Sequence, residues 1–399
     1  MLFSEVIGHA ATKQHLAEMV EQNRLSHALL FLAKEGSGGL PLALAFAQYV
    51  VSLPPDAPVV EDLFGGMTAL APAPTFIHPN DIATQPGYQR ANLLLHPDLH
   101  FTYPVITKKT GEKPISNDYI EDWRTFLQTY PYGNAYDWLQ SIGAENKQGN
   151  ITAEECNQIN RQLSLKSFES KYKVLLLWMP EYLGKEGNKL LKLIEEPPPN
   201  TIFILVAENE ELILPTILSR CQLVRVPALE DSDIVNALVE RSGATVELAK
   251  QISAICEGNY RDALHLLQHA DEDWHSLLRE WLNAMLKSGP AAQVKFIEEV
   301  SRLGREKQKQ FLRYFNHLLE QSIRIRVLGE EKIKQGDTEK DFAKRLNKIA
   351  SVSQQEAIIE ELDKAAYYIE RNAHAKMLFH ALTIKLYHII QNKTLILNN

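Results

Sequence analysis

The chain of 399 residues carries a formal net charge of −8 and has a pI of about 5.9. With 45% hydrophobic and 23% charged residues it has the composition of a globular protein, which argues against a mostly disordered chain or a fibrous rod. Proteins that bind DNA on their own more often carry a basic surface. The acidic balance therefore predicts that any role near DNA runs through partner proteins.

Signals for membranes, secretion and metals are weak. No apolar run approaches the roughly 20 residues that a membrane span needs, and MLFSEVIGHA at the start has no basic segment followed by an apolar one. The three cysteines form no CxxC pair, which argues against a disulfide framework or a cysteine-based zinc site. We therefore expect a cytoplasmic protein with no metal and no cofactor.

In chain order, short apolar runs alternate with helical patterns up to about residue 226. The predicted strands are 28–32, 173–177, 201–206 and 222–226, and the predicted helices include 40–51 and 181–196. Thr152 followed three residues later by Glu155 is a capping box and predicts the start of another helix. Fully apolar strands interleaved with helices are typical of a parallel α/β sheet covered on both faces, so we predict an α/β fold.

Proline separates two regions of the chain. Eighteen of the 19 prolines lie at or before Pro227 and only Pro290 follows, so the later part can be almost entirely helical. Residues 54–95 are rich in proline and glycine and predict an irregular surface insertion. From Asp273 onward the pattern predicts long amphipathic helices. Their predicted apolar faces are Phe311, Phe315, Leu318 and Leu319 on one helix, and Met377, Leu378, Ala381, Leu382 and Ile384 on the last.

A glycine cluster lies between the first strand and the following helix, where nucleotide-binding proteins carry a phosphate loop. That loop reads GxxxxGK[ST]: its N–H groups hold the phosphates, its lysine reaches the β- and γ-oxygens, and its hydroxyl ligates magnesium. Here Ala33 stands at the first glycine, Gly39 at the lysine and Leu40 at the hydroxyl position. The residues Gly36, Ser37, Gly38 and Gly39 can keep the shape of the loop without its charge chemistry. We interpret them as a degenerate nucleotide loop.

The end of the strand 173–177 tests this interpretation independently. In a phosphate-cleaving ATPase such a strand ends in acidic residues that hold magnesium and orient the attacking water. Here those positions are Trp178 and Met179, which can do neither, and Glu181 lies beyond them, where it can offset a helix dipole. Both losses predict that the chain is not an ATPase.

Ser219, Arg220 and Cys221 lie at the end of a predicted helix, directly before the strand 222–226. An arginine fixed there presents a planar fork suited to phosphate oxygens. It can equally offset the dipole at the helix C-terminus, and the spacing alone favours this structural role.

Several segments together resemble the delta-prime family of subunits of the bacterial DNA polymerase III clamp loader, within the AAA+ superfamily. They are FSEVIGH at the start, RLSHALLF before the glycine cluster, EGSGGLPLALAFAQYV through it, HPDLHF at 96–101, NKLLKLIEEPPPNTIFILV at 188–206, LPTILSRCQ at 214–222 and EGNYRDAL at 257–264. The resemblance covers residues 1 to about 270. It implies an AAA+ α/β domain with a RecA-like parallel sheet over 1–228, carrying the insertion 54–95, then a helical lid over 229–271 and an all-helical collar for oligomerisation over 272–399.

The resemblance also implies a function. Subunits of this family commonly act as a rigid stator in a hetero-pentameric ring with motor (gamma/tau) and delta subunits, and the ring places the sliding clamp on primed DNA. The arginine of the SRC triplet, here Arg220 between Ser219 and Cys221, acts in trans on ATP bound by a neighbouring motor subunit. Arg261 matches the lid arginine that senses nucleotide.

The chain departs from the family pattern in places. Family members often carry a four-cysteine zinc module after the phosphate-loop helix, but residues 54–95 contain no cysteine, so we expect no zinc. We expect His78 and His96 at the surface, Arg261 in a packing role, and the carboxylates of Glu195 and Glu196 at a solvated helix end.

Two other functions stay open. An autonomous AAA+ ATPase, such as a motor subunit or a branch-migration helicase, would need lysine at 39, a hydroxyl at 40 and acids at 178–179. A DNA-associated scaffold outside replication would not copurify with delta, motor subunits and clamp.

Overall fold

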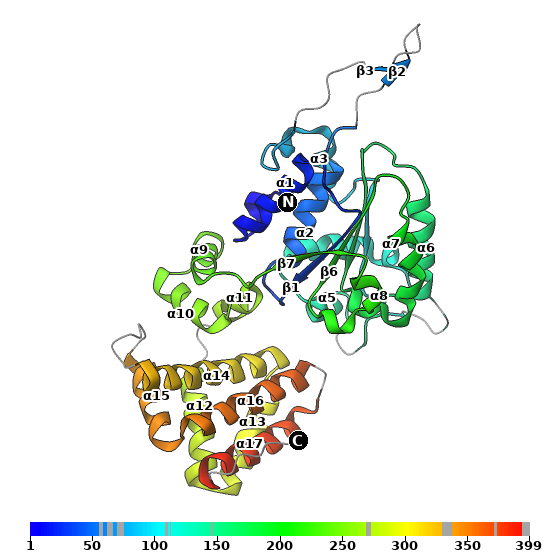
Figure 1. Ribbon diagram of the computed structural model, residues 1–399. Helices are drawn as coiled ribbons and strands as arrows, with labels where there is room; N and C mark the ends of the chain where they lie inside the picture. The colour runs from blue at the N-terminus through cyan, green and yellow to red at the C-terminus, as the bar shows by residue number, and fades with distance from the viewer. Residues whose placement is uncertain are drawn as a thin grey trace. The chain divides into compact units, whose positions relative to one another are not determined.

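The computed structural model describes residues 1–55, 59–61, 67–69, 76–107, 111, 113–144, 147–268, 273–328, 337–370 and 373–392. The chain divides into two compact units, Met1–Leu264 and His265–Asn399 (Figure 1). In the part of the chain that is described, no helix is long and apolar enough to span a membrane.

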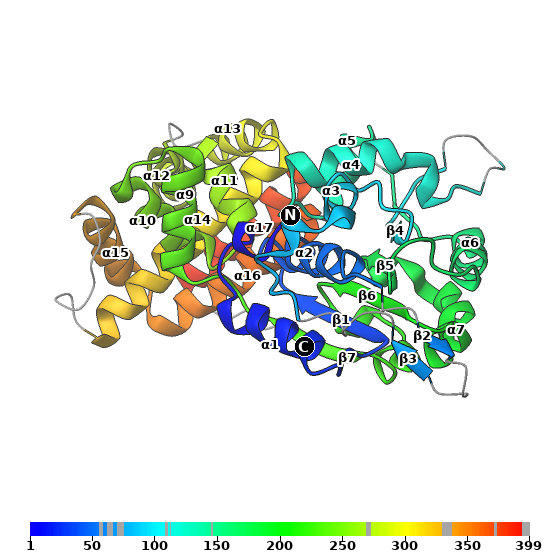
Figure 2. The same cartoon turned by 90° about the horizontal axis from the view of Figure 1, so that it is seen from above.

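A five-stranded parallel sheet forms the centre of the first unit (Figure 2). Its strands, in the order β4-β5-β6-β1-β7, are β4 Leu99–Thr102, β5 Lys173–Trp178, β6 Thr201–Ala207, β1 Ala28–Ala33 and β7 Gln222–Val226. Successive residues of β1 enter different cores: Leu29 and Phe31 pack on one face of the sheet and Leu30 on the other. The sheet is thus parallel and covered on both faces, as predicted.

The helices of the first unit include α1 Ala10–Glu21, α2 Gly39–Val51, α3 Pro86–Asn92, α4 Ile120–Thr129, α5 Ala135–Ser141, α6 Ala153–Ser164, α7 Leu191–Glu195 and α8 Pro215–Leu218, followed by α9 Asp231–Ser242, α10 Val246–Cys256 and the start of α11 Tyr260–Gln268, whose last residues belong to the second unit. Every residue of α2 is buried, which explains its apolar sequence. The predicted helix 181–196 is a 3-10 helix, Pro180–Leu190, followed by α7, and the 3-10 helix is kinked at Gly184, which leaves helical geometry at φ +49. Thr152 caps α6 as predicted, accepting the N–H of Glu155, but the capping box is incomplete because the Glu155 carboxylate accepts from the Thr102 hydroxyl and the Ser116 N–H instead.

The segment 54–95 contains regular structure in its described parts, so the prediction of an irregular insertion is wrong there. It forms the strands β2 Val59–Glu61 and β3 Met67–Ala69 and the helix α3. His78 is exposed, as expected, but His96 is buried: its Nε2 lies 3.2 Å from a Glu169 carboxylate oxygen, and its Nδ1 accepts the N–H of Asp98.

The second unit is helical throughout its described residues, as the proline distribution predicted. Its helices are α12 Trp274–Asn283, a π-helix Ala284–Ser288, α13 Pro290–Ser301, α14 Arg305–Leu328, α15 Asp337–Ile349, α16 Val352–Glu370 and α17 Ala375–Asn392. The predicted apolar face of α14 is buried. The predicted face of α17 is only partly right: Leu382 is buried, but Met377 is 71% and Ile384 54% exposed, and Phe379 and Leu386 are buried on the side of Leu382.

Candidate functional site: a filled nucleotide loop and an exposed arginine

The glycine loop makes a tight turn between a strand and a helix. It connects the C-terminal end of β1 to the first residue of α2, Gly39. Gly36 and Gly38 adopt φ of +65 and +98, a region that favours glycine. Ser37 closes the turn: its N–H and its hydroxyl donate to the Lys34 carbonyl at 3.1 and 2.6 Å. The local sequence therefore specifies the turn.

The space that a lysine would need at position 39 is taken. A Cβ placed on Gly39 would lie closer than 3.0 Å to the Ala33 methyl group, so the alanine and the glycine are complementary in size. Leu40, at the hydroxyl position, is 5% exposed and belongs to the core. The cavity that remains beside the loop has a volume of about 20 Å³. That is room for about one water molecule, against the ~300 Å³ or more of typical small-molecule sites.

Aromatic packing replaces the acidic end of β5. Trp178 is 2% exposed, and its ring centroid lies 5.2 Å from that of Trp123 and 5.8 Å from that of Phe126. Met179 is buried as well. Glu181 does more than face a helix dipole: its Oε1 accepts the N–H groups of Glu208 and Asn209 at 2.6 and 2.9 Å, directly after β6. Burial raises the pKa of the Glu181 carboxyl.

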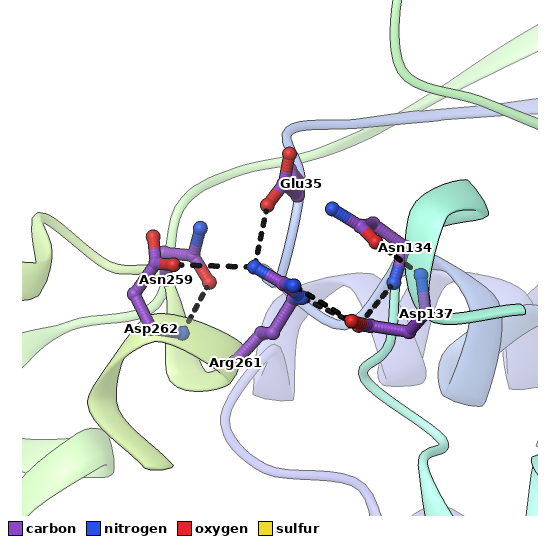
Figure 3. Close-up of polar contacts among 6 residues, drawn as sticks. All are labelled: Glu35, Asn134, Asp137, Asn259, Arg261 and Asp262. Atoms are coloured by element: carbon purple, nitrogen blue, oxygen red, sulfur yellow. Dashed lines mark hydrogen bonds and ion pairs between the residues drawn. The ribbon is translucent and has the colours of Figure 1, made fainter. Parts of the chain in front are cut away.

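Side chains from two distant segments close the mouth of the loop (Figure 3). Arg261, at the start of α11 and 3% exposed, donates through Nε and Nη2 to the two carboxylate oxygens of Asp137 on α5, at 2.5 and 2.7 Å. Its Nη1 lies 3.3 Å from Glu35 of the loop and 3.5 Å from its neighbour Asp262. The packing role predicted for Arg261 thus takes the form of a buried ion-pair network.

Arg220 lies in the turn between α8 and β7, and its side chain is 31% exposed. Its Nε donates to Glu195 Oε1 at 2.6 Å and its Nη1 to the Thr216 carbonyl at 2.7 Å. Glu195 is therefore an ion-pair partner rather than a merely solvated helix end. Ser219 accepts a further bond from Arg220 at 3.2 Å, and burial raises the pKa of the neighbouring Cys221 thiol to about 11.

The register of the sheet separates Arg220 from the glycine loop of its own chain. Gln222, two residues after Arg220, pairs with Leu29, whereas the loop follows Ala33 at the other end of β1. Four residues of strand span about 13 Å. The predicted site residues thus form two groups: the glycine loop with Arg261 at the C-terminal end of β1, and the triplet Ser219–Cys221 at the opposite end of the parallel strands.

Sequence reasoning missed three carboxylates, Glu35, Asp137 and Glu195, because their partners lie far away along the chain. Asp137 is 124 residues from Arg261, and Glu195 is 25 residues from Arg220. The acidic EEPP run and the acidic neighbour of the glycine cluster were visible signals. Nothing marked Asp137 except the N-cap that it shares with Asn134, which accepts its N–H at 2.9 Å.

Known proteins show which family this chain resembles. Residues 88–230 match the family described as DNA polymerase III, delta subunit. Over 152 residues the chain is 33% identical to DNA polymerase III subunit gamma of Buchnera aphidicola subsp. Schizaphis graminum, a match covering 37% of this chain and 41% of that protein. It is 24% identical over 227 residues to subunit delta' of Bacillus subtilis, covering 57% of this chain and 50% of that protein.

A solved structure of a DNA polymerase III gamma subunit-related protein from Thermotoga maritima is 14% identical, covers 94% of this chain and 99% of that one, and has a TM-score of 0.39. The chain spans half or less of the length of the two curated relatives just named. From the sequence matches, parts of the chain are similar to subunits of DNA polymerase III, among them gamma, tau and delta'.

Proposed function

We propose that the chain is a delta'-type stator of a clamp-loader ring, which hydrolyses no ATP itself and supplies Arg220 to ATP bound by a neighbouring motor subunit. Its partners in this proposal are gamma/tau and delta subunits in a hetero-pentameric ring, the sliding clamp, and primed DNA reached through the complex. In the proposal the division into an AAA+ domain (1–228), a lid (229–271) and a collar (272–399) follows that role.

The filled nucleotide site carries this proposal. Phosphoryl transfer needs a cation on the phosphates, a magnesium ligand and a group that positions the nucleophile. The corresponding positions hold Gly39, Leu40, Trp178 and Met179, and the residual cavity is about 20 Å³. A pocket filled in this way supports a structural subunit rather than a motor.

One observation favours a motor subunit instead: the gamma relative from Buchnera is more identical, at 33%, than the delta' relative from Bacillus, at 24%. These matches span less than two thirds of the chain, and identity over a fold does not fix the chemistry of a site. A motor would show magnesium-dependent ATP hydrolysis by the purified chain, which the filled site argues against.

The position of Arg220 supports a role toward a neighbouring subunit. It lies about 13 Å or more along the sheet from its own glycine loop, and a trans arginine is worth about 10³–10⁵ in the rate of phosphoryl transfer. Glu195 holds its guanidinium in a half-exposed position at the surface, and this ion pair is replaceable by phosphate oxygens, which bind the same planar fork.

The test is the steady-state ATPase rate, stimulated by clamp and primed DNA, of reconstituted rings of verified stoichiometry. Arg220→Ala should leave assembly intact and lower the rate of the ring, and Arg220→Lys should recover little because an ammonium lacks the fork. The exposed Arg225 on β7 provides a matched control. If Arg220→Ala and Arg225→Ala rings keep the wild-type rate, Arg220 is only a helix-terminal arginine; equal losses in both point to a general effect of surface charge.

A further inference from the structure

The lid helices α9–α11 of the first unit contact the glycine loop directly. The Tyr260 N–H, at the start of α11, donates to the Gly36 carbonyl at 3.0 Å. The Asn259 side chain lies so close to Gly36 that a Cβ there would overlap it. The Tyr260 ring packs edge-on against Tyr132, with 5.0 Å between centroids, and the Tyr132 hydroxyl accepts the Ile7 N–H at 2.8 Å. The loop, the N-terminal segment and the lid therefore meet in one buried seam.

Within this seam Arg261 binds carboxylates where the lid arginine of a nucleotide-binding site would bind phosphate. Its fork pairs with both oxygens of Asp137, the bidentate geometry that guanidinium forms equally with carboxylate and with phosphate (Figure 3). Glu35, on the loop itself, approaches the same guanidinium at 3.3 Å. One guanidinium thus joins three segments: the loop, α5 and the lid.

The charges of this cluster disfavour an anion. Arg261, with one formal positive charge, faces three carboxylates, those of Asp137, Glu35 and Asp262. A nucleoside triphosphate would add several negative charges to a site that is already acidic, and no cavity of its size is present beside the loop. The side chain of Arg261 is 3% and that of Asp137 13% exposed, so solvent ions screen the pairs little.

We propose that Asp137 and Glu35 form an internal latch that substitutes for nucleotide phosphate: they bind Arg261 and hold the lid helices closed on the glycine loop whether or not nucleotide is present. The inference rests on the proposed stator function and gives it a mechanism. A lid that closes on the chain's own carboxylates does not respond to ATP, so the subunit keeps one conformation through the cycles of its neighbours.

The latch is tested by hydrogen exchange of the full chain, followed by mass spectrometry of peptides from α9–α11. The double variant Glu35→Gln/Asp137→Asn removes both charges and keeps the size of both side chains, and it leaves an oxygen at position 137 to accept the N–H of Asn134. It should raise the exchange rate of α9–α11 by about tenfold or more, because local opening sets that rate. The control Glu247→Gln, exposed on α10, should leave the rate unchanged. Wild-type exchange in α9–α11 should be the same with and without millimolar magnesium ATP.

The outcomes separate the latch from the proposed function. Unchanged exchange in the double variant would overturn the latch and leave the Arg220 experiment standing. Slower exchange of wild-type α9–α11 on adding magnesium ATP would show a responsive nucleotide site, which contradicts the proposed function as well. Exchange in β1, β5 and β6 shows whether the double variant is folded. If those strands also exchange fast, the single variant Asp137→Asn replaces the double variant. It should raise the exchange rate of α9–α11 by a smaller factor, and an unchanged rate would overturn the latch.

Discussion

The pairing of Ala33 with Gly39 makes a quantitative prediction. Gly39 begins α2 and has an ordinary negative φ, so replacing it by alanine at an open site would stabilise the fold by about 0.4–1 kcal/mol through the unfolded chain. Here the new methyl group would lie closer than 3.0 Å to the Ala33 Cβ, and both positions are buried. Gly39→Ala should therefore destabilise the first unit.

The magnitude follows from overpacking. Forcing an extra methyl group into a packed core costs typically about 1–3 kcal/mol, which exceeds the backbone gain. Ala33→Gly removes a buried methyl group and adds a glycine to a strand, which costs about 1–2 kcal/mol. The double variant Ala33→Gly/Gly39→Ala exchanges the two side chains. Its loss in free energy of unfolding should be smaller than the sum of the two single losses by about 1–3 kcal/mol.

Urea unfolding of fluorotryptophan-labelled protein, followed by fluorine NMR, is a suitable assay. Of the five tryptophans, Trp123, Trp138 and Trp178 report on the first unit, and Trp274 and Trp281 give an internal reference in the second. The reasoning is refuted if Gly39→Ala stabilises the first unit, or if the two substitutions are additive to within about 0.5 kcal/mol. The same geometry predicts that Gly39→Lys alone yields no ATP hydrolysis, since Ala33 obstructs the side chain and Trp178 and Met179 still replace the acids.

Three further predictions follow from the acidic balance, the collar and a buried histidine. Burial, aided by the nearby Lys173 charge, lowers the pKa of His100 to about 4, so protonation favours the unfolded chain, whose histidine pKa is near 6.5. The free energy of unfolding of the first unit should thus fall by about 2 kcal/mol between pH 7 and 5 from this residue alone; a His100→Asn variant with the same pH dependence as wild type would contradict this. A chain ending at Gln268 should keep the tryptophan NMR signals of a folded first unit but fail to enter the ring; normal assembly on gel filtration would remove the collar role. With a net charge of −8, the isolated chain should bind primed DNA weakly and mainly at low salt, and tight binding at physiological salt in a fluorescence-anisotropy titration would favour a DNA-binding adaptor.

The parts of the fold that depend on local pattern were predictable. Three of the four predicted strands, β1, β5 and β6, are almost entirely apolar because both of their faces are covered. The fourth, β7, lies at the edge of the sheet and carries the exposed Gln222 and Arg225. The other edge strand, β4, is missing from the predicted strands, because it is four residues long and its residues His100 and Phe101 are only partly buried. The predicted apolar face of α17 is only partly right because apolar residues lie on both sides of this helix, and only its packing decides which of them are buried.

In the candidate site, too, the residues specified by local pattern were predictable and their distant partners were not. The loop and the arginine were found from residue types at fixed spacing, which is what a turn or a helix end requires. Their partners Asp137 and Glu195 come from other elements, and only the tertiary fold brings them to Arg261 and Arg220. A sequence shows that an arginine is there, but the carboxylate that neutralises it lies wherever the fold places one.

The aromatic cluster around Trp178 determines how easily this site could acquire an acidic residue at the end of β5. The rings of Trp123, Phe126 and Trp138 pack on one another beneath the loop, and Trp178 packs on the first two. Replacing Trp178 by aspartate would leave a large void with a charge inside it, and removing a buried tryptophan side chain alone costs about 3–5 kcal/mol. Against a total stability of about 5–15 kcal/mol, that single step would bring the domain near unfolding before any catalytic benefit appeared. An acidic residue at position 178 would therefore be tolerated only if several neighbouring positions changed together.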